Sequence, residues 1–162
     1  MKPRKSEDEF QPELLKTQLI HLIDMNHSLV QLANKFNWTR VDEICSTKFC
    51  TDNGRPALPS RLVVGLLLIK QMCDLSDVEV CAKFIESPYV QYFCGGVYFE
   101  HSIGLTSESL TNWRKRLGTE TFEHILVETI YLGLVEEVIS PKDLSEVISD
   151  TTAQEKNITY PT

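Results

Sequence analysis

The pattern of apolar and polar positions predicts a protein built mainly from α-helices. Apolar residues recur every three or four positions within successive segments, and turn-forming residues separate one segment from the next. Helices are expected over residues 12–24, 28–36, 39–48, 60–73, 76–86, 89–94, 107–118 and 120–132. This arrangement is typical of a multi-helix domain with the helices packed on one core.

The segment 60–73 carries the strongest helical signal. Its apolar side chains extend nearly all the way round the helix, which predicts a central, buried element. The sequence from Ser76 to Glu79 matches a capping box, in which a hydroxyl and a carboxylate satisfy the free backbone amides of a helix start. The sequence pattern therefore predicts both the core helix and the first turn of its successor.

The helical pattern ends after Gly133. Pro141 predicts a break, and residues 146–150 are short, β-branched and strand-like. A single strand is not stable without a pairing partner, so the pattern predicts that the rest of a sheet is missing. We therefore expect three parts: a flexible tail over residues 1–10, a helical domain over 11–139, and the start of a second domain over 140–162.

Charge and hydropathy narrow the function classes. The net charge of −7 argues against a simple nucleic-acid binder, but residues 121–162 contribute eight acidic and only two basic side chains. A local basic patch on the rest of the chain can still bind DNA. No apolar run reaches the roughly 18 residues of a membrane span, and the N-terminus does not have the pattern of a signal peptide. We expect a cytoplasmic protein without a membrane partner.

The five cysteines do not indicate a metal site. They are odd in number, and no pair has C-x-x-C spacing. We interpret them as reduced structural thiols rather than zinc ligands.

Residues 107–118 form the segment with the most suggestive chemistry. On a helix, Leu110, Trp113 and Leu117 make one apolar stripe that would dock on the core. The side chains predicted to project away from this stripe are Thr111, Asn112, Lys115 and Arg116. Asparagine and arginine can reach base edges, while lysine and threonine can contact phosphates, so the segment fits a helix lying on DNA.

A solvated basic face on an amphipathic helix is the alternative interpretation, and from the residues alone it is the commoner case. Arg114, Lys115 and Arg116 would together give a salt dependence with a slope of about −2.7. That is weak binding, so further cations would have to contribute. The candidates are Arg55, Arg61, Lys2, Arg4 and Lys5.

Two other features, the aromatic residues of 89–99 and Asp150, each have a structural and a functional interpretation. The aromatic residues of 89–99 could stack on bases, but a packing layer under the following loop is favoured. Asp150 ends the predicted strand, where ribonuclease-H-like enzymes hold magnesium-binding carboxylates. From the residues alone, an aspartate in a turn is clearly the favoured interpretation of Asp150.

Several long motifs, which occur in the same order as in a known family, favour the functional interpretations over the structural ones. The segments Gly54–Lys70, Leu75–Val80, Pro88–Gly95 and Leu110–Gly118 resemble the N-terminal domain of bacterial insertion-sequence transposases of the InsH type. The segment Val147–Thr162 resembles the region around the first catalytic aspartate of these DDE enzymes.

The resemblance implies a function in DNA transposition. The helical region would bind the terminal inverted repeats of a mobile element, and Asp150 would be the first of three carboxylates that bind Mg²⁺. With only one of the three present, we expect an N-terminal fragment that is inactive in strand cleavage and transfer and holds no Mg²⁺. Two alternatives stay open. The chain is a dimerisation module that inhibits or complements an intact transposase, or it is half of an enzyme completed by a second reading frame.

Overall fold

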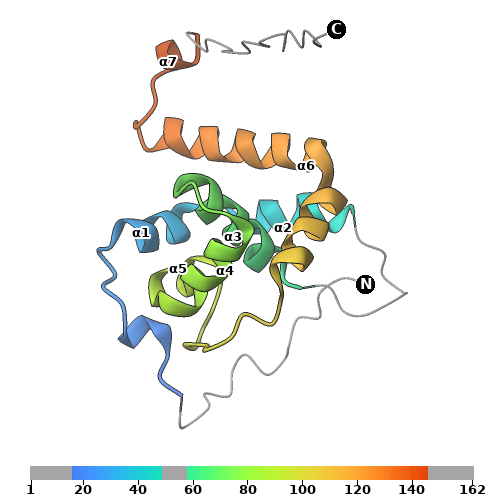
Figure 1. The fold of residues 1–162 in the computed structure, drawn as a ribbon. Helices are drawn as coiled ribbons and strands as arrows, with labels where there is room; N and C mark the ends of the chain where they lie inside the picture. The colour runs from blue at the N-terminus through green and yellow to red at the C-terminus, as the bar shows by residue number, and fades with distance from the viewer. Residues whose placement is uncertain (1–15, 49–57, 146–162) are drawn as a thin grey trace, which may run out of the picture.

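The computed structural model describes residues 16–48 and 58–145, which form a bundle of helices (Figure 1). In chain order the elements are η2 (Leu19–His21), α1 (Ser28–Lys35), α2 (Trp38–Ser46), α3 (Ser60–Met72), α4 (Asp77–Glu86), α5 (Pro88–Phe93), α6 (Ser107–Val135) and α7 (Pro141–Ser145). No strand occurs in these two ranges, and a single antiparallel bridge joins Gln18 to Tyr98. The predicted mainly α class is confirmed, whereas the strand predicted over residues 146–150 lies outside the described residues.

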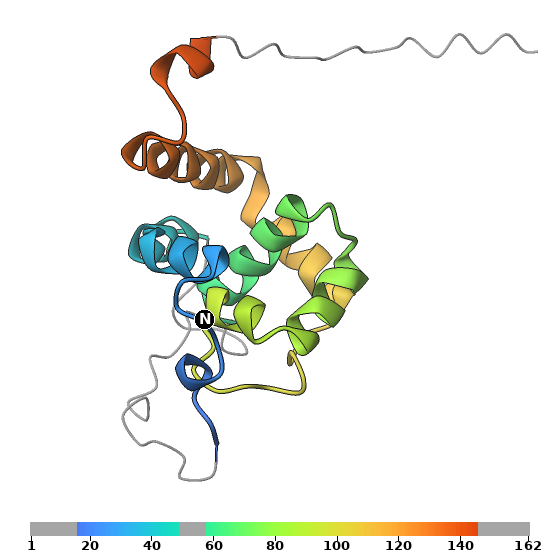
Figure 2. The same ribbon diagram turned by 90° about the vertical axis from the view of Figure 1, so that its left-hand side faces the viewer.

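Helix α3 lies at the centre of the bundle, as its apolar composition predicts. Val63, Leu66 and Ile69 are each at most 2% exposed, and α3 contacts both α2 and α4. Figure 2 shows α1 and α2 at the left of the body and α3 and α4 at its centre and right, while α5 lies beneath α1, which it contacts. A helix that is apolar all round is stable only when other elements cover it on several sides.

Local side chains fix where the helices begin. The predicted capping box is present: the backbone N–H of Glu79 donates to Ser76 Oγ at 3.2 Å, and Ser76 N–H donates to Glu79 Oε2 at 2.7 Å. The carboxylate of Glu79 has a lowered pKa because the Ser76 backbone N–H stabilises its charged form. Ser87 caps α5, where Pro88 occupies the first turn.

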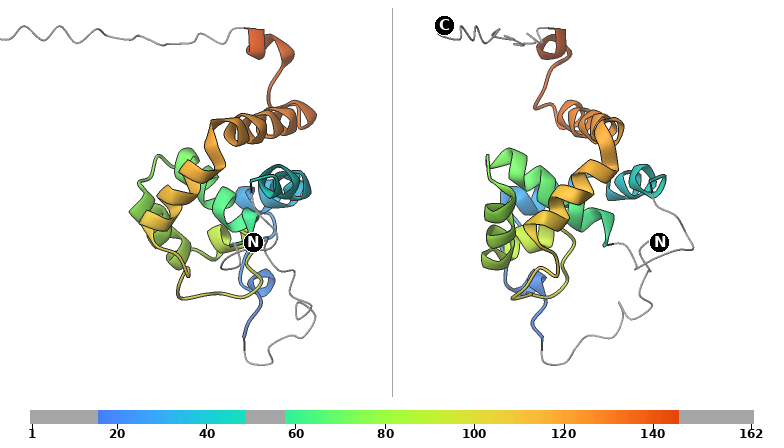
Figure 3. Two further views of the ribbon diagram at one scale, coloured as in Figure 1. Left: turned by 90° about the vertical axis from the view of Figure 1, so that its right-hand side faces the viewer. Right: turned by 45° about the vertical axis from the view of Figure 1, so that its right-hand side comes forward.

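Helix α6 changes direction at Gly118. This residue has φ 72° and ψ 169°, which no regular helix contains and which glycine adopts far more easily than other residues. Figure 3 shows the resulting bend between the first segment (residues 107–117) and the second segment (residues 119–135). The predicted boundary between two helices at Gly118 is confirmed.

Two predicted elements differ from the structure. The described part of the helix expected over residues 12–24 holds only the single turn η2, because the backbone of this segment pairs with the 97–98 loop: Leu19 N–H donates to the carbonyl of Val97 at 2.8 Å. Pro141 was predicted to interrupt helical structure, but it begins the helix α7. The carboxylate of Asp143 accepts hydrogen bonds from the backbone N–H and the hydroxyl of Ser140 at the start of this helix. Proline at the first helical position costs no hydrogen bond, because that N–H has no partner within the helix.

Candidate nucleic-acid interface

The first segment of α6 is held against the core by its apolar stripe. Leu110 is 0% exposed and Leu117 is 1% exposed, while Trp113 is half-buried against the same core. At its start, Thr106 Oγ1 accepts a hydrogen bond from the N–H of Ser109 at 3.3 Å. The docking predicted for Leu110, Trp113 and Leu117 is therefore confirmed.

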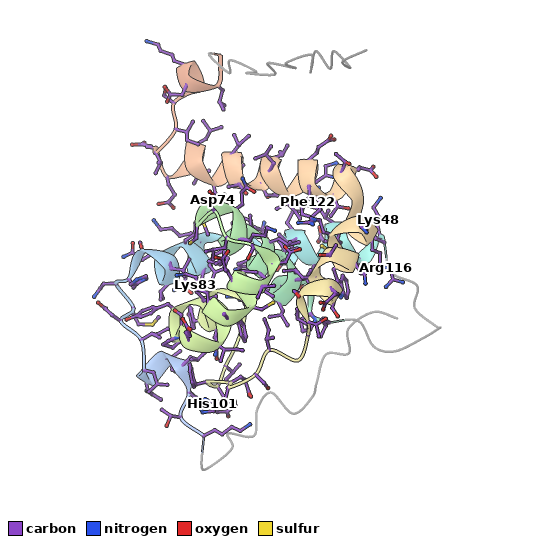
Figure 4. All side chains as sticks on the ribbon, viewed as in Figure 1. Lys48, Asp74, Lys83, His101, Arg116 and Phe122 are labelled. Carbon is purple, nitrogen blue, oxygen red and sulfur yellow. The ribbon has the colours of Figure 1, made fainter. Side chains whose placement is uncertain are left out.

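The opposite side of this segment presents polar and basic side chains. Asn112, Lys115 and Arg116 are all exposed, as expected for residues that project away from the stripe. Figure 4 shows Arg116 at the edge of the molecule, on the same side of the view as Lys48 of the α2 C-terminus. This surface has the chemistry of a phosphate-contacting face: two cations and an amide on a rigid helix.

Thr111 and Arg114 have a different position from the one predicted. Thr111 Oγ1 donates to Asp77 Oδ2 at 2.7 Å, and Arg114 Nη1 lies 3.5 Å from Asp77 Oδ1. Lys70 Nζ of α3 donates to the same Oδ1 at 2.5 Å. Asp77 therefore joins α3, α4 and α6, and the first segment of α6 is fixed by polar contacts as well as by its apolar stripe.

The carboxylate of Asp77 is held in its charged form. Its side chain is only 16% exposed, and its pKa is lowered, first by the hydrogen bond from Lys70 and then by that from Thr111. Its contact with Arg114 offsets the positive charge of that arginine. Lys115 and Arg116, the other two cations of the first segment of α6, are both exposed.

Arg61 lies within the fold rather than on a surface. Its Nε donates to the carbonyl of Phe93 at 3.0 Å, and its Nη2 donates to that of Tyr92 at 3.1 Å. Its guanidinium also lies 4.7 Å from the ring centroid of Trp38, which is cation–π distance. Burial lowers the pKa of this side chain. Arg61 thus satisfies the last carbonyls of α5, a structural position that the sequence prediction did not foresee.

The remaining predicted cations and the predicted catalytic residue cannot be placed. Arg55, Asp150 and the N-terminal Lys2, Arg4 and Lys5 lie outside the described residues. In the part of the chain that the structure describes, no group of three or more His, Cys, Asp or Glu side chains could hold a metal ion.

Sequence reasoning missed Lys48, which the fold brings to the second segment of α6. Lys48 Nζ contacts Glu120 Oε2 at 2.8 Å, at the edge of a polar groove of about 520 Å³ between α2 and α6. Arg40 and His124 also line this groove. No local pattern connects these residues, since α2 and α6 are far apart in the sequence.

The aromatic residues after α4 mostly serve packing. Phe93 is 1% exposed and meets Trp38 edge-on, with ring centroids 5.2 Å apart. Tyr92 donates its hydroxyl proton to Asn34 at 2.9 Å, and Tyr89 stacks on His27. The stack on His27 occupies a ring face of Tyr89 that a base would need, and burial removes Phe93 from contact with DNA.

Comparison with known proteins identifies the family. Residues 17–116 match the family model described as "Transposase domain (DUF772)". This chain belongs to that transposase family. It is also 38% identical over 150 residues to the "Uncharacterized protein ORF8 in nfe locus" of Rhizobium meliloti, covering 93% of this chain and 72% of the relative. No solved structure matches.

The family match assigns this chain a transposase-related role. It also shows which residues of the chain correspond to the transposase domain. The matched residues begin before η2 and end at Arg116, so they contain α1 to α5 and nearly all of the first segment of α6. The second segment of α6 lies beyond them. Across the described ranges, no helix is both long and apolar enough to cross a membrane.

Proposed function

We propose that this transposase-family chain binds double-stranded DNA through the outer face of the first segment of α6. The observation that carries the proposal is the way this segment is fixed. Leu110 and Leu117 anchor it in the core and Thr111 anchors it on Asp77, while Asn112 and Lys115 stay exposed. A rigid helix that presents an amide and cations is suited to contact both base edges and phosphates.

The structure reduces the electrostatic contribution expected from this helix. Because Asp77 lies 3.5 Å from Arg114 and offsets its charge, we expect the salt slope of this segment to be smaller in magnitude than about −2.7. Lys48 lies near this segment, but Glu120 Oε2 is 2.8 Å from its Nζ and offsets its charge in the same way. We therefore expect binding that is weak at physiological salt and that strengthens only moderately as salt is lowered.

Fluorescence anisotropy with a labelled duplex over a series of salt concentrations tests this proposal. Lys115→Ala and Arg116→Ala should each weaken binding and lower the magnitude of the salt slope by about 0.9. Lys83→Ala is the matched control, since Lys83 is an exposed lysine on α4, away from Arg116 (Figure 4). Absence of DNA binding at low salt, or equal effects of Lys83→Ala and Lys115→Ala, would contradict the proposal.

Asp150 and magnesium enter the proposal only through the resemblance in the sequence. We propose Asp150 as one carboxylate of a Mg²⁺ site that other acidic residues would have to complete. The chain by itself is then expected to bind DNA without cleaving it. Incubation of supercoiled DNA with the chain and Mg²⁺ should leave the DNA intact, and nicking that Asp150→Asn abolishes would contradict this expectation.

A further inference from the structure

Three glutamates of the second segment of α6 and its C-cap pair with cations of α1 and α2. The pairs are Glu120 with Lys48, Glu128 with Arg40, and Glu136 with Lys35. Figure 2 shows this part of α6 lying above α1 and α2. Residues 119–140 contain five glutamates and no lysine or arginine. The second segment of α6 therefore sets acidic side chains against the cations of the two helices below it.

These ion pairs lie at the surface and leave the cations open to solvent. The side chains of Lys35 and Lys48 are 48% and 33% exposed, and that of Glu120 is 70% exposed. Surface ion pairs contribute little to stability, because both partners are well solvated when they are apart. The second segment of α6 also packs on the core through Ile125, which is 3% exposed, and through Phe122. The glutamates therefore contribute little to holding this helix, and a polyanion can displace them from the lysines.

The polar groove between α2 and α6 places further phosphate-binding groups beside Lys48. Arg40 and Thr47 line this groove of about 520 Å³ together with Lys48. Cations and hydroxyl groups are side chains that contact phosphate oxygens in protein–DNA interfaces. Arg40 Nη1 also lies 3.0 Å from Glu43 Oε2, so its charge is offset by a glutamate of its own helix as well as by α6. Lys35 and Lys48 are therefore the two cations at which the α6 glutamates have the clearest effect.

The positions of the two lysines fit the dimensions of a DNA duplex. Their partners Glu120 and Glu136 lie in one helix and its C-cap, at positions separated by about 24 Å of helical rise. One turn of B-DNA is longer than this, at about 34 Å. Lys48 is also close to the proposed DNA-binding segment, because Glu120 follows Arg116 by a stretch of chain of about 14 Å at most. Both lysines thus lie within one turn of DNA of each other, with Lys48 at the end nearer to Arg116.

From these pairs we infer that Lys35 and Lys48 form a second contact site for the DNA backbone, at which Glu120 and Glu136 compete with the phosphates. The ligand is duplex DNA, so the inference rests on the proposed function. A lysine that exchanges its glutamate for a phosphate releases a counterion from the DNA, which favours binding at low salt. The two glutamates thus lower the DNA affinity of the chain. Both lysines lie within the residues that match the transposase family, whereas both glutamates lie beyond them.

Fluorescence anisotropy with a labelled duplex tests the inference on the full chain. The double variant Glu120→Gln, Glu136→Gln keeps the shape of both side chains and removes their charge. At about 0.05 M salt we expect it to bind DNA about tenfold more tightly than the wild type, with a salt slope larger in magnitude by about 1.8, because two more cations can contact phosphates. Adding Lys35→Ala and Lys48→Ala to this variant should abolish both gains. The urea midpoint of the double variant should stay close to that of the wild type, since surface ion pairs contribute little to stability.

The matched control is the double variant Glu123→Gln, Glu137→Gln. Both glutamates are exposed, and within residues 16–48 and 58–145 neither pairs with a cation of α1 or α2. The control therefore removes the same charge from the same part of the chain without freeing a lysine, and screening should limit its gain in affinity to about twofold. Equal gains from the two double variants, or a gain that survives the removal of both lysines, would overturn the inference.

The same titrations separate this inference from the proposed function. If Lys115→Ala and Arg116→Ala leave DNA affinity unchanged while the glutamine variant binds more tightly through Lys35 and Lys48, the inference stands and the proposed function fails. If Lys115→Ala weakens binding and the glutamine variant behaves like its control, the proposed function stands and the inference fails. Absence of DNA binding by the wild type and by every variant at low salt would contradict both.

Discussion

Thr111 donates a hydrogen bond to Asp77 across 34 positions of sequence, with an Oγ1–Oδ2 distance of 2.7 Å. Asp77 is the first residue of α4 and also accepts from Lys70 of α3. One carboxylate thus fixes the orientation of the proposed DNA-binding segment relative to the two helices beneath it. Asp77 is therefore a positioning residue. Its replacement should lower the stability of the protein and loosen the orientation of the first segment of α6.

Replacement of Asp77 by asparagine should lower the free energy of unfolding. Asp77→Asn keeps the size of the side chain but removes the charge that stabilises Lys70 and Arg114, so we expect a loss of about 1–3 kcal/mol in urea unfolding. Glu86→Gln, at an exposed position of the same helix, should change stability by less than about 0.5 kcal/mol. Equal unfolding midpoints for the two variants would show that the Asp77 contacts contribute nothing.

The contribution of Asp77 should depend on pH with a defined sign. Its folded-state pKa is lowered from 3.8, so the stabilisation is present above that unfolded-state value and is lost as pH falls through the lower folded value. The stability difference between wild type and Asp77→Asn should be constant above about pH 5 and shrink below about pH 4. Urea unfolding across that range measures it, and a difference that persists unchanged into strong acid would contradict the assignment.

Substitution of Gly118 should destabilise the protein through the backbone alone. A Cβ atom at Gly118 would meet nothing within 4 Å, but φ of +72° with ψ of 169° strains any other residue. We expect Gly118→Ala to cost about 1–3 kcal/mol. Thr119→Ala, at the adjacent exposed position, is the control and should cost little. If both variants unfold at the same urea concentration, the bend of α6 does not depend on glycine.

Arg61 should not tolerate lysine. Arg61→Lys cannot donate to the carbonyls of Phe93 and Tyr92 while stacking on Trp38, because lysine has no planar fork. We expect a loss of about 1–3 kcal/mol in thermal or urea unfolding. Arg40→Lys is the control, since Arg40 is exposed and its ion pairs with glutamates on the surface contribute little. A stability of Arg61→Lys equal to that of Arg40→Lys would contradict the structural role of Arg61.

The sequence by itself determined those helices and helix ends that depend on interactions between residues close together in the chain. The capping box of Ser76 and Glu79, the apolar helix 60–72 and the break at Gly118 all follow from residues within four positions of one another or from the backbone of one residue. Helical hydrogen bonds and caps act over that same range, which is why periodicity and capping patterns predicted them. The apolar stripe of Leu110 and Leu117 was predictable for the same reason.

Only the tertiary structure decided how the cations are used. Arg61, Arg114 and Lys115 look alike in the sequence, yet the first binds carbonyls about 30 positions away, the second meets Asp77, and the third stays exposed. The turn at Leu19 was likewise decided by the distant carbonyl of Val97, which took the place of a helical partner. A side chain's function depends on which distant groups the packed core brings within hydrogen-bonding distance, and short-range patterns in the sequence do not contain that information.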